Sequence, residues 1–287
     1  MSLRGFDSPG GSSITYTTNI MEAKVKKFNS LAELAAFVDG NAPNGYYANR
    51  RRLSSVETES PRRRNKFYGT ESYAAANDMM LHGWREGAER INAYMTQAPA
   101  AVSDRPRNYN AVVGFAPNVP NYIAGVPLNM INCKRVRVPA RVVDIIYNCA
   151  VSHSVSPQAI EAAAAKLFNV IAGLERGGVR VNLWVMEVSY GAPEYHAAAV
   201  KIKTASQPFN LLKMVYPIVH PSFLRRHMFA VKERMKLSES AGWAGYGSPA
   251  PKKTSELAAS MDIKTANVFS YYSISQKSEK DLAAMIR

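Results

Sequence analysis

The stretch that decides the fold is residues 141–189, RVVDIIYNCAVSHSVSPQAIEAAAAKLFNVIAGLERGGVRVNLWVMEVS. Residues 142–147 are apolar and β-branched, which is typical of a strand buried on both faces. Ser156, followed by proline, predicts the N-cap of a helix whose apolar residues recur at helical spacing until a Gly-Gly pair. Residues 179–188 again resemble a strand. The stretch therefore predicts a strand–helix–strand unit with a parallel crossover.

Around this unit we expect an α/β (or α+β) fold with a mixed, largely parallel sheet. Residues 196–204 alternate as a further strand, and their short connection to 180–188 predicts antiparallel pairing. The last 27 residues are expected to supply one more strand, within 261–272, and a terminal helix, 278–287. The predicted division is a flexible N-terminal arm (1–27), a mainly helical, basic portion (28–135) and the α/β domain (136–287).

The N-terminal portion is predicted to contain three helices. Ser30 opens a capping box before a helix over 31–38. Helices over about 71–82 and 85–96 are expected to meet at Gly83, with Trp84 buried between them. Glu86 and Arg90 are spaced to pair on the second of these helices. A short strand is expected over 111–115, followed by a structured loop rich in Pro and Gly.

Residues 210–235 predict a long helix that Pro217 and Pro221 break or kink. Its core stripe is expected to consist of Leu212, Val215, Phe223, Met228 and Val231. Its basic residues predict an exposed face, made of Arg225, Arg226, Lys232, Arg234 and Lys236.

Charge is the main functional signal. The chain carries 36 Lys and Arg residues against 22 acidic ones, a formal net charge of +14. Such an excess favours a polyanionic partner, nucleic acid first, over a cationic surface that serves only solubility. No apolar run is long enough to cross a bilayer, and the N-terminus lacks a signal peptide, so we expect a cytoplasmic protein without a membrane partner.

The most basic segment, 46–68, interleaves arginines with aromatic residues. Arginines neutralise phosphates and rings stack on unpaired bases, so the pattern indicates a single-stranded DNA or RNA site. The alternative is a solvated basic loop. The candidate nucleic-acid-binding residues are Tyr46, Tyr47, Arg50, Arg51, Arg52, Arg62, Arg63, Arg64, Lys66 and Tyr68.

The turn Ala150-Val151-Ser152-His153-Ser154 follows the central strand. Its Ser-x-Ser spacing resembles the metal-binding turn of von Willebrand factor A domains, over residues 140–205. The resemblance implies an acidic residue where this chain has Ala150, so we expect the metal site to be degenerate. Three roles remain open for Ser152 and Ser154: capping the helix, binding an anion or partner carboxylate, and binding metal. Asn148, Ser152 and Ser154 are the candidate partner-binding residues.

Catalytic motifs are not found. The chain has no phosphate-binding glycine loop, no His-Glu-x-x-His, no Gly-x-Ser-x-Gly and no Cys-x-x-Cys. Cys133 and Cys149 are expected to be reduced thiols. We therefore expect neither an enzyme nor a cofactor.

The chain also resembles an uncharacterised family of tailed-bacteriophage and prophage proteins. The residues that carry this resemblance are 83–87 (GWREG), 117–120 (PNVP) with 124–127 (AGVP), and the block 142–156. It implies a phage protein acting in the host cytoplasm or carried in a virion. Three functions follow as hypotheses: a nucleic-acid-binding accessory protein, a module that docks a phage or host protein such as an ATPase or polymerase subunit, and a virion structural component.

Overall fold

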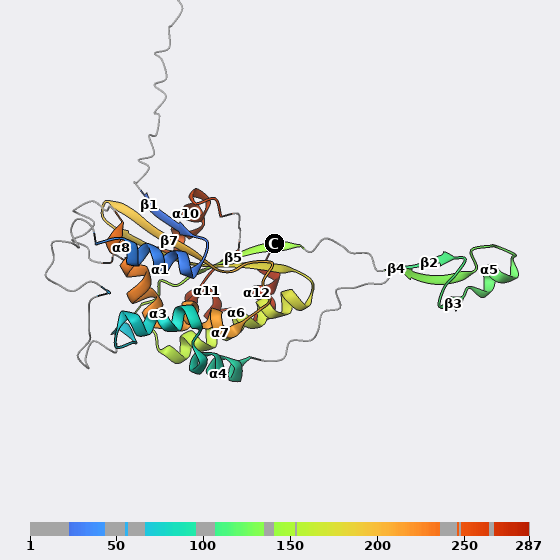
Figure 1. The fold of residues 1–287 in the computed structure, drawn as a ribbon, viewed down its shortest axis with the longest axis horizontal. Coiled ribbons are helices and arrows are strands. Elements are labelled where there is room, and N and C mark those ends of the chain that lie inside the picture. The colour runs from blue at the N-terminus through green and yellow to red at the C-terminus, as the bar shows by residue number, and fades with distance from the viewer. Residues whose placement is uncertain are drawn as a thin grey trace, which may run out of the picture.

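The computed structural model describes residues 23–43, 55–56, 67–95, 107–134, 141–152, 154–235, 246, 248–263 and 267–286. Its strands form a six-stranded sheet and a three-stranded sheet. The larger sheet has the order β1-β7-β6-β5-β9, with β8 paired to β6. Figure 1 shows this sheet and its helices as one body, with the three-stranded sheet standing apart.

The predicted strand–helix–strand unit is present as β5 (Val142–Asn148), α6 (Pro157–Arg176) and β6 (Arg180–Gly191). Strands β5 and β6 run parallel. Ser156 caps α6, because its Oγ accepts a hydrogen bond from the backbone N–H of Ala159 at 3.3 Å. The unit is confirmed, and it places the carboxyl end of β5 beside the middle of β6.

The remaining strands complete a mixed, largely parallel sheet. Strand β7 (Glu194–Lys203) forms the predicted antiparallel hairpin with β6. Strand β9 (Asn267–Ser270) is parallel to β5, and β1 (Ala23–Phe28) is parallel to β7. The short β8 (Ser248–Pro249) is antiparallel to β6. The expected α/β class is therefore confirmed.

Strand β1 corrects the predicted N-terminal arm. Residues 23–27 were expected to be flexible, but they pair with β7 from Ala23 opposite Tyr195 to Phe28 opposite Val200. Phe28 is 1% exposed and fills the core. A lysine-rich strand suits a sheet edge, yet its partner lies far along the chain, so the local sequence does not reveal the pairing. Residues 1–22 lie outside the described part.

Helices cover both faces of the sheet. One face packs against α1 (Leu31–Gly40), α3 (Tyr73–His82), α4 (Arg85–Tyr94), α6 and α7 (Leu211–Val219), which share one continuous core. The other face is covered by α10 (Thr254–Ser260) in a smaller cluster. The N-terminal helices therefore belong to the same core as the sheet, and they do not form a separate domain.

The predicted helix joint at Gly83 is confirmed. Helix α3 ends there with a φ of +103°, and Trp84, 8% exposed, is buried. The backbone N–H of Trp84 donates to the carbonyl of Leu212 at 3.2 Å, which ties the joint to α7. Arg90 lies over the Trp84 ring and forms an ion pair with Glu161 of α6, at 3.0 Å. The partner predicted for Arg90 from the helical spacing was Glu86.

The segment after β7 is broken near its prolines, as predicted. Helix α7 ends at Val219, and the chain continues as the π-helix η2 (Phe223–Met228) and then α8 (Phe229–Arg234). The predicted core stripe is buried at all positions except Leu212, which is half-buried.

The prediction of an exposed basic face on this segment is wrong. Arg226, Lys232 and Arg234 are 0%, 2% and 8% exposed. Each cation is buried with hydrogen-bond acceptors: the guanidinium of Arg234, for example, donates to the carbonyl of Val38 at 2.7 Å. Periodicity alone does not distinguish a solvated cation from one that a distant segment neutralises. Arg225 is half-buried, and Lys236 lies outside the described residues.

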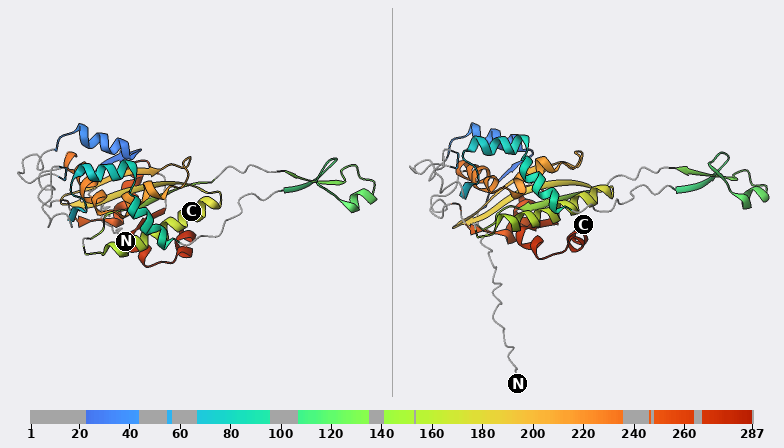
Figure 2. Two further views of the ribbon diagram at one scale, coloured as in Figure 1. Left: turned by 60° about the horizontal axis from the view of Figure 1, so that its bottom comes forward. Right: turned by 90° about the horizontal axis from the view of Figure 1, so that it is seen from below.

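The three-stranded sheet comprises β2 (Arg107–Ala111), β3 (Ala116–Pro117) and β4 (Met130–Lys134), with the short helix α5 (Val119–Ile123) between β3 and β4. The strand predicted over 111–115 is displaced, since β2 ends at Ala111. The views of Figure 2 again show this unit projecting from the body.

The C-terminal elements follow the predicted order. The expected strand within 261–272 is shorter than predicted and is β9, followed by α11 (Tyr271–Ser275). The terminal helix is α12 (Glu279–Met285), and a capping box between Ser278 and Asp281 stabilises its N-terminus. Among the described helices, none is long and apolar enough to span a membrane.

Two helical glycines give a matched test of the packing. A Cβ at Gly87 would lie 2.0 Å from Cε3 of Trp84, whereas a Cβ at Gly173 meets nothing within 4 Å. We expect Gly87→Ala to lower the free energy of unfolding by about 1–3 kcal/mol through overpacking. Gly173→Ala is expected to raise it by about 0.4–1 kcal/mol. Urea unfolding measures both, and equal effects would contradict this packing of Trp84.

Candidate functional site

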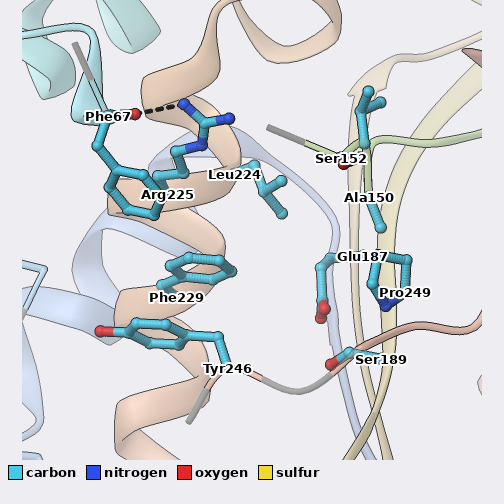
Figure 3. A pocket seen from close by; sticks show the side chains of 11 residues that line it. Phe67, Ala150, Ser152, Glu187, Ser189, Leu224, Arg225, Phe229, Tyr246 and Pro249 are labelled. Atoms are coloured by element: carbon cyan, nitrogen blue, oxygen red, sulfur yellow. Dashed lines mark hydrogen bonds between the residues drawn. The ribbon is translucent and has the colours of Figure 1, made fainter. Parts of the chain in front are cut away.

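A cavity of about 190 Å³ opens beyond the carboxyl end of β5, between the sheet and the η2–α8 segment (Figure 3). In open α/β sheets, ligands bind in the crevice outside the carboxyl ends of the strands. The cavity lies at such an end, where the turn that leads from β5 to α6 begins. The lining residues are Phe67, Ala150, Val151, Ser152, Glu187, Ser189, Leu224, Arg225, Phe229, Tyr246 and Pro249.

The sheet side of the cavity carries a buried polar group. Glu187 and Ser189, two residues apart on β6, point to the same face. Burial raises the pKa of Glu187, while nearby Lys232 and Ser189 oppose the shift. The ammonium of Lys232 donates to Ser189 Oγ at 2.8 Å and to the Tyr246 carbonyl at 2.6 Å. The cavity therefore offers a carboxyl group at the edge of a buried ionisable cluster.

The helical side of the cavity is aromatic. The rings of Phe229 and Tyr246 stack with centroids 3.7 Å apart and planes 5° from parallel. The Arg225 guanidinium lies 4.7 Å from the centroid of the Phe67 ring and donates to the Phe67 carbonyl. Figure 3 shows these rings facing Glu187 across the cavity. The arrangement suits a planar ligand that has hydrogen-bonding edges.

Two buried side chains of the η2–α8 segment hold the sequence on either side of residues 57–66. Arg226 donates to Thr70 Oγ1 and to the Thr70 carbonyl, both at 2.8 Å, and to the Ser55 carbonyl at 3.1 Å. Glu233 accepts from the Ser55 backbone N–H at 2.8 Å. Buried charges require such partners. The described residues on both sides of 57–66, within and just after the basic segment 46–68, are thus attached next to the cavity.

Most of the predicted nucleic-acid-binding residues lie outside the described residues, namely Tyr46, Tyr47, Arg50, Arg51, Arg52, Arg62, Arg63, Arg64 and Lys66. Tyr68 is described and half-buried. Its ring lies 4.6 Å from the Arg226 guanidinium and edge-on to Phe67. Tyr68 therefore belongs to the attachment of the segment. The rings that line the cavity include Phe229 and Tyr246, which no local pattern singles out.

Asn148, Ser152 and Ser154 separate in the structure. Asn148 is 1% exposed, its amide donates to Thr254 Oγ1 at 2.7 Å, and its Oδ1 accepts from the Ala150 N–H at 2.9 Å. Its predicted partner-binding role is wrong, because both polar ends are used inside the protein. Ser152 and Ser154 are exposed, with their hydroxyls 2.9 Å apart, and Ser152 lines the cavity.

The described residues contain no cluster of three or more His, Cys, Asp or Glu side chains that would hold a metal ion. Cys133 and Cys149 are unpaired with each other, as expected. Burial raises the pKa of the Cys149 thiol, which keeps it protonated and poorly nucleophilic.

Three histidines support the core: His196 and His227 are buried, and His220 is half-buried. His220 stacks on Tyr216, and His227 Nε2 lies 3.0 Å from the Tyr216 hydroxyl. Burial lowers the pKa of His196 and of His220 to about 4, and that of His227 to about 3. All three are therefore neutral at pH 7.

These pKa values predict acid sensitivity. Between about pH 4 and pH 6.5 the unfolded chain binds protons that the folded histidines do not, so stability falls as the pH is lowered through that window. Each histidine contributes up to about 1.4 kcal/mol per pH unit. The raised pKa of Glu187 acts in the opposite sense. We expect His227→Gln to reduce the slope, measured by urea unfolding at several pH values; a slope equal to that of the native protein would contradict this.

The comparisons with known proteins give one match. A family model described as "Domain of unknown function (DUF7192)" matches residues 15–287. No curated protein and no solved structure matches the chain.

Proposed function

The chain belongs to the DUF7192 family, and we propose that it binds single-stranded DNA or RNA at the carboxyl edge of the sheet, where the cavity opens. The observation that carries the proposal is that the residues on either side of 57–66 are attached next to the cavity. Arg226 and Glu233 hold Ser55 and Thr70, on either side of residues 57–66, beside a cavity walled by aromatic rings.

The arginines of the basic segment and the rings of the cavity offer complementary contacts to a nucleic acid. Arg62, Arg63 and Arg64 lie between the attachment points in sequence and supply phosphate contacts, with Arg50, Arg51, Arg52 and Lys66. An unpaired base has a flat face for the rings of Phe229 and Tyr246 and a polar edge for Glu187. The net charge of +14 attracts any nucleic acid.

The proposal needs no catalytic step or cofactor. It keeps the accessory role in a bacteriophage that the sequence resemblance implies, with action in the host cytoplasm or in the virion.

Removal of Arg62, Arg63 and Arg64 should change the salt dependence of nucleic-acid binding. For single strands the slope of log K against log salt is about −0.7 per phosphate contact, so replacing Arg62, Arg63 and Arg64 with Ala should reduce its magnitude by about 2. The control replaces the exposed Arg85, Lys213 and Lys280, which removes the same charge away from the cavity. Fluorescence anisotropy with labelled oligonucleotides over a salt series measures the slope.

Removal of the Phe229 ring should lower the affinity without affecting the salt dependence. Phe229→Leu is expected to weaken single-strand binding by about 1–3 kcal/mol without changing the salt slope. Equal slopes for the two triple variants, or no binding by the native protein at low salt, would overturn the proposal.

A protein-docking role is the second candidate, and the exposure of Ser152 and Ser154 favours it. Their hydroxyls stand at the end of β5, in the turn that resembles von Willebrand factor A domains. Under this proposal the turn contacts a phage or host protein, such as an ATPase or polymerase subunit.

Replacing Ser152 and Ser154 together with Ala separates the two candidates. Docking predicts loss of a captured partner with nucleic-acid binding intact. Because Ser156, not these serines, caps α6, the unfolding midpoint should be unchanged. Pull-down and anisotropy on the same variant measure the two activities, and retention of the partner by the double variant would reject the docking candidate.

A further inference from the structure

The three-stranded sheet and α5, residues 107–134, form a projecting module whose polar groups are turned to one another. Backbone bonds join Phe115 N–H to the Ile131 carbonyl at 2.9 Å and Asn118 N–H to the Asn129 carbonyl at 2.7 Å. The side-chain amide of Asn132 donates to the Val113 carbonyl at 2.8 Å. The asparagines thus satisfy the backbone from within the module.

The apolar side chains of the projecting module face outward. No residue in 108–133 is buried, and nine large apolar residues are between 38% and 78% exposed. They are Tyr109, Val112, Val113, Phe115, Val119, Tyr122, Ile123, Val126 and Leu128. Apolar surface gathered in this way marks an interaction site, and a sheet this small has no core of its own to stabilise it.

Apart from its two end residues, Arg107 and Lys134, the projecting module is also uncharged. Residues 108–133 contain no Asp, Glu, Lys, Arg or His, in a chain of net charge +14. Two copies of the body repel each other, whereas two modules do not. A surface without charge is therefore the part of this molecule on which two copies can meet at the lowest electrostatic cost.

The rest of the described chain offers no comparable apolar surface. Its large exposed apolar side chains within the body are Val25, Tyr94, Val142, Tyr272 and Met285, which stand on five different elements. For a second copy of this chain, the matching surface is thus the same module.

We propose that the projecting module is a homotypic interface, which docks on the projecting module of a second copy. A two-fold arrangement buries the same apolar residues from both chains and keeps the basic bodies apart (Figures 1 and 2). Strand β2 is at the edge of the small sheet and is available for pairing across the axis. This inference is independent of the proposed nucleic-acid site.

Sedimentation of the nuclease-treated full chain over a concentration series tests the proposal. We expect conversion from a species of 31.6 kDa to one of twice that mass. Salt should strengthen the association, because it screens the repulsion between bodies and no charges meet at the interface. This is the opposite of its effect on nucleic-acid binding.

Variants localise the interface. Tyr122→Asp with Ile123→Asp should weaken self-association at least tenfold, whereas Met285→Asp, an exposed apolar residue of the body, should not change it. The unfolding midpoint of the body should be the same in all three proteins, because residues 108–133 contribute no buried residue and Met285 is 43% exposed.

Four outcomes would overturn the proposal. They are a native protein that stays at 31.6 kDa throughout, a dimer that the Asp variant retains, a dimer that nuclease abolishes, and a monomer whose module instead binds uncharged lipid vesicles.

Discussion

The buried guanidinium of Arg226 is the interaction on which the arrangement of the candidate site depends. A cation that is 0% exposed needs acceptors for its donors, and Arg226 takes them from Ser55 and Thr70. Glu233, seven residues or about two helical turns further on, accepts from Ser55 as well. These contacts attach Ser55 and Thr70, on either side of residues 57–66, to the η2–α8 segment. The same η2–α8 segment supplies one wall of the cavity, so both attachment points are held next to the cavity.

The cavity itself follows from sheet topology. Strand β6 continues past the end of β5, and its residues Glu187 and Ser189 are therefore presented beyond the carboxyl edge of the neighbouring strand. Lys232 reaches the same place from α8 and donates to Ser189. An ionisable cluster of this kind is costly to bury, and such clusters gather at functional sites. Its position opposite the Phe229 and Tyr246 rings gives the cavity one polar side and one aromatic side.

Two surfaces with opposite chemistry thus coexist in one chain. The body carries most of the positive charge and the cavity, and the module carries exposed apolar side chains with no charged residue between Arg107 and Lys134. Under the two proposals, salt acts on these surfaces in opposite directions, because counterion release would weaken phosphate binding while screening would favour the approach of like-charged bodies. A protein that assembles through one surface and binds a polyanion through the other would place several basic segments on one strand, which raises the effective concentration of each.

By itself, the sequence determined the elements whose signals are local. The buried strand at 142–148, the Ser156 cap, the Gly83 joint around Trp84 and the break near Pro217 and Pro221 all follow from neighbouring residues. Only the tertiary structure decided what depends on distant partners: that residues 23–28 pair with β7, that Arg226 and Lys232 are buried, and that Asn148 faces inward. The physical reason is that the charge state and exposure of a polar side chain depend on which acceptors the fold brings to it, and those acceptors lie tens to hundreds of residues away.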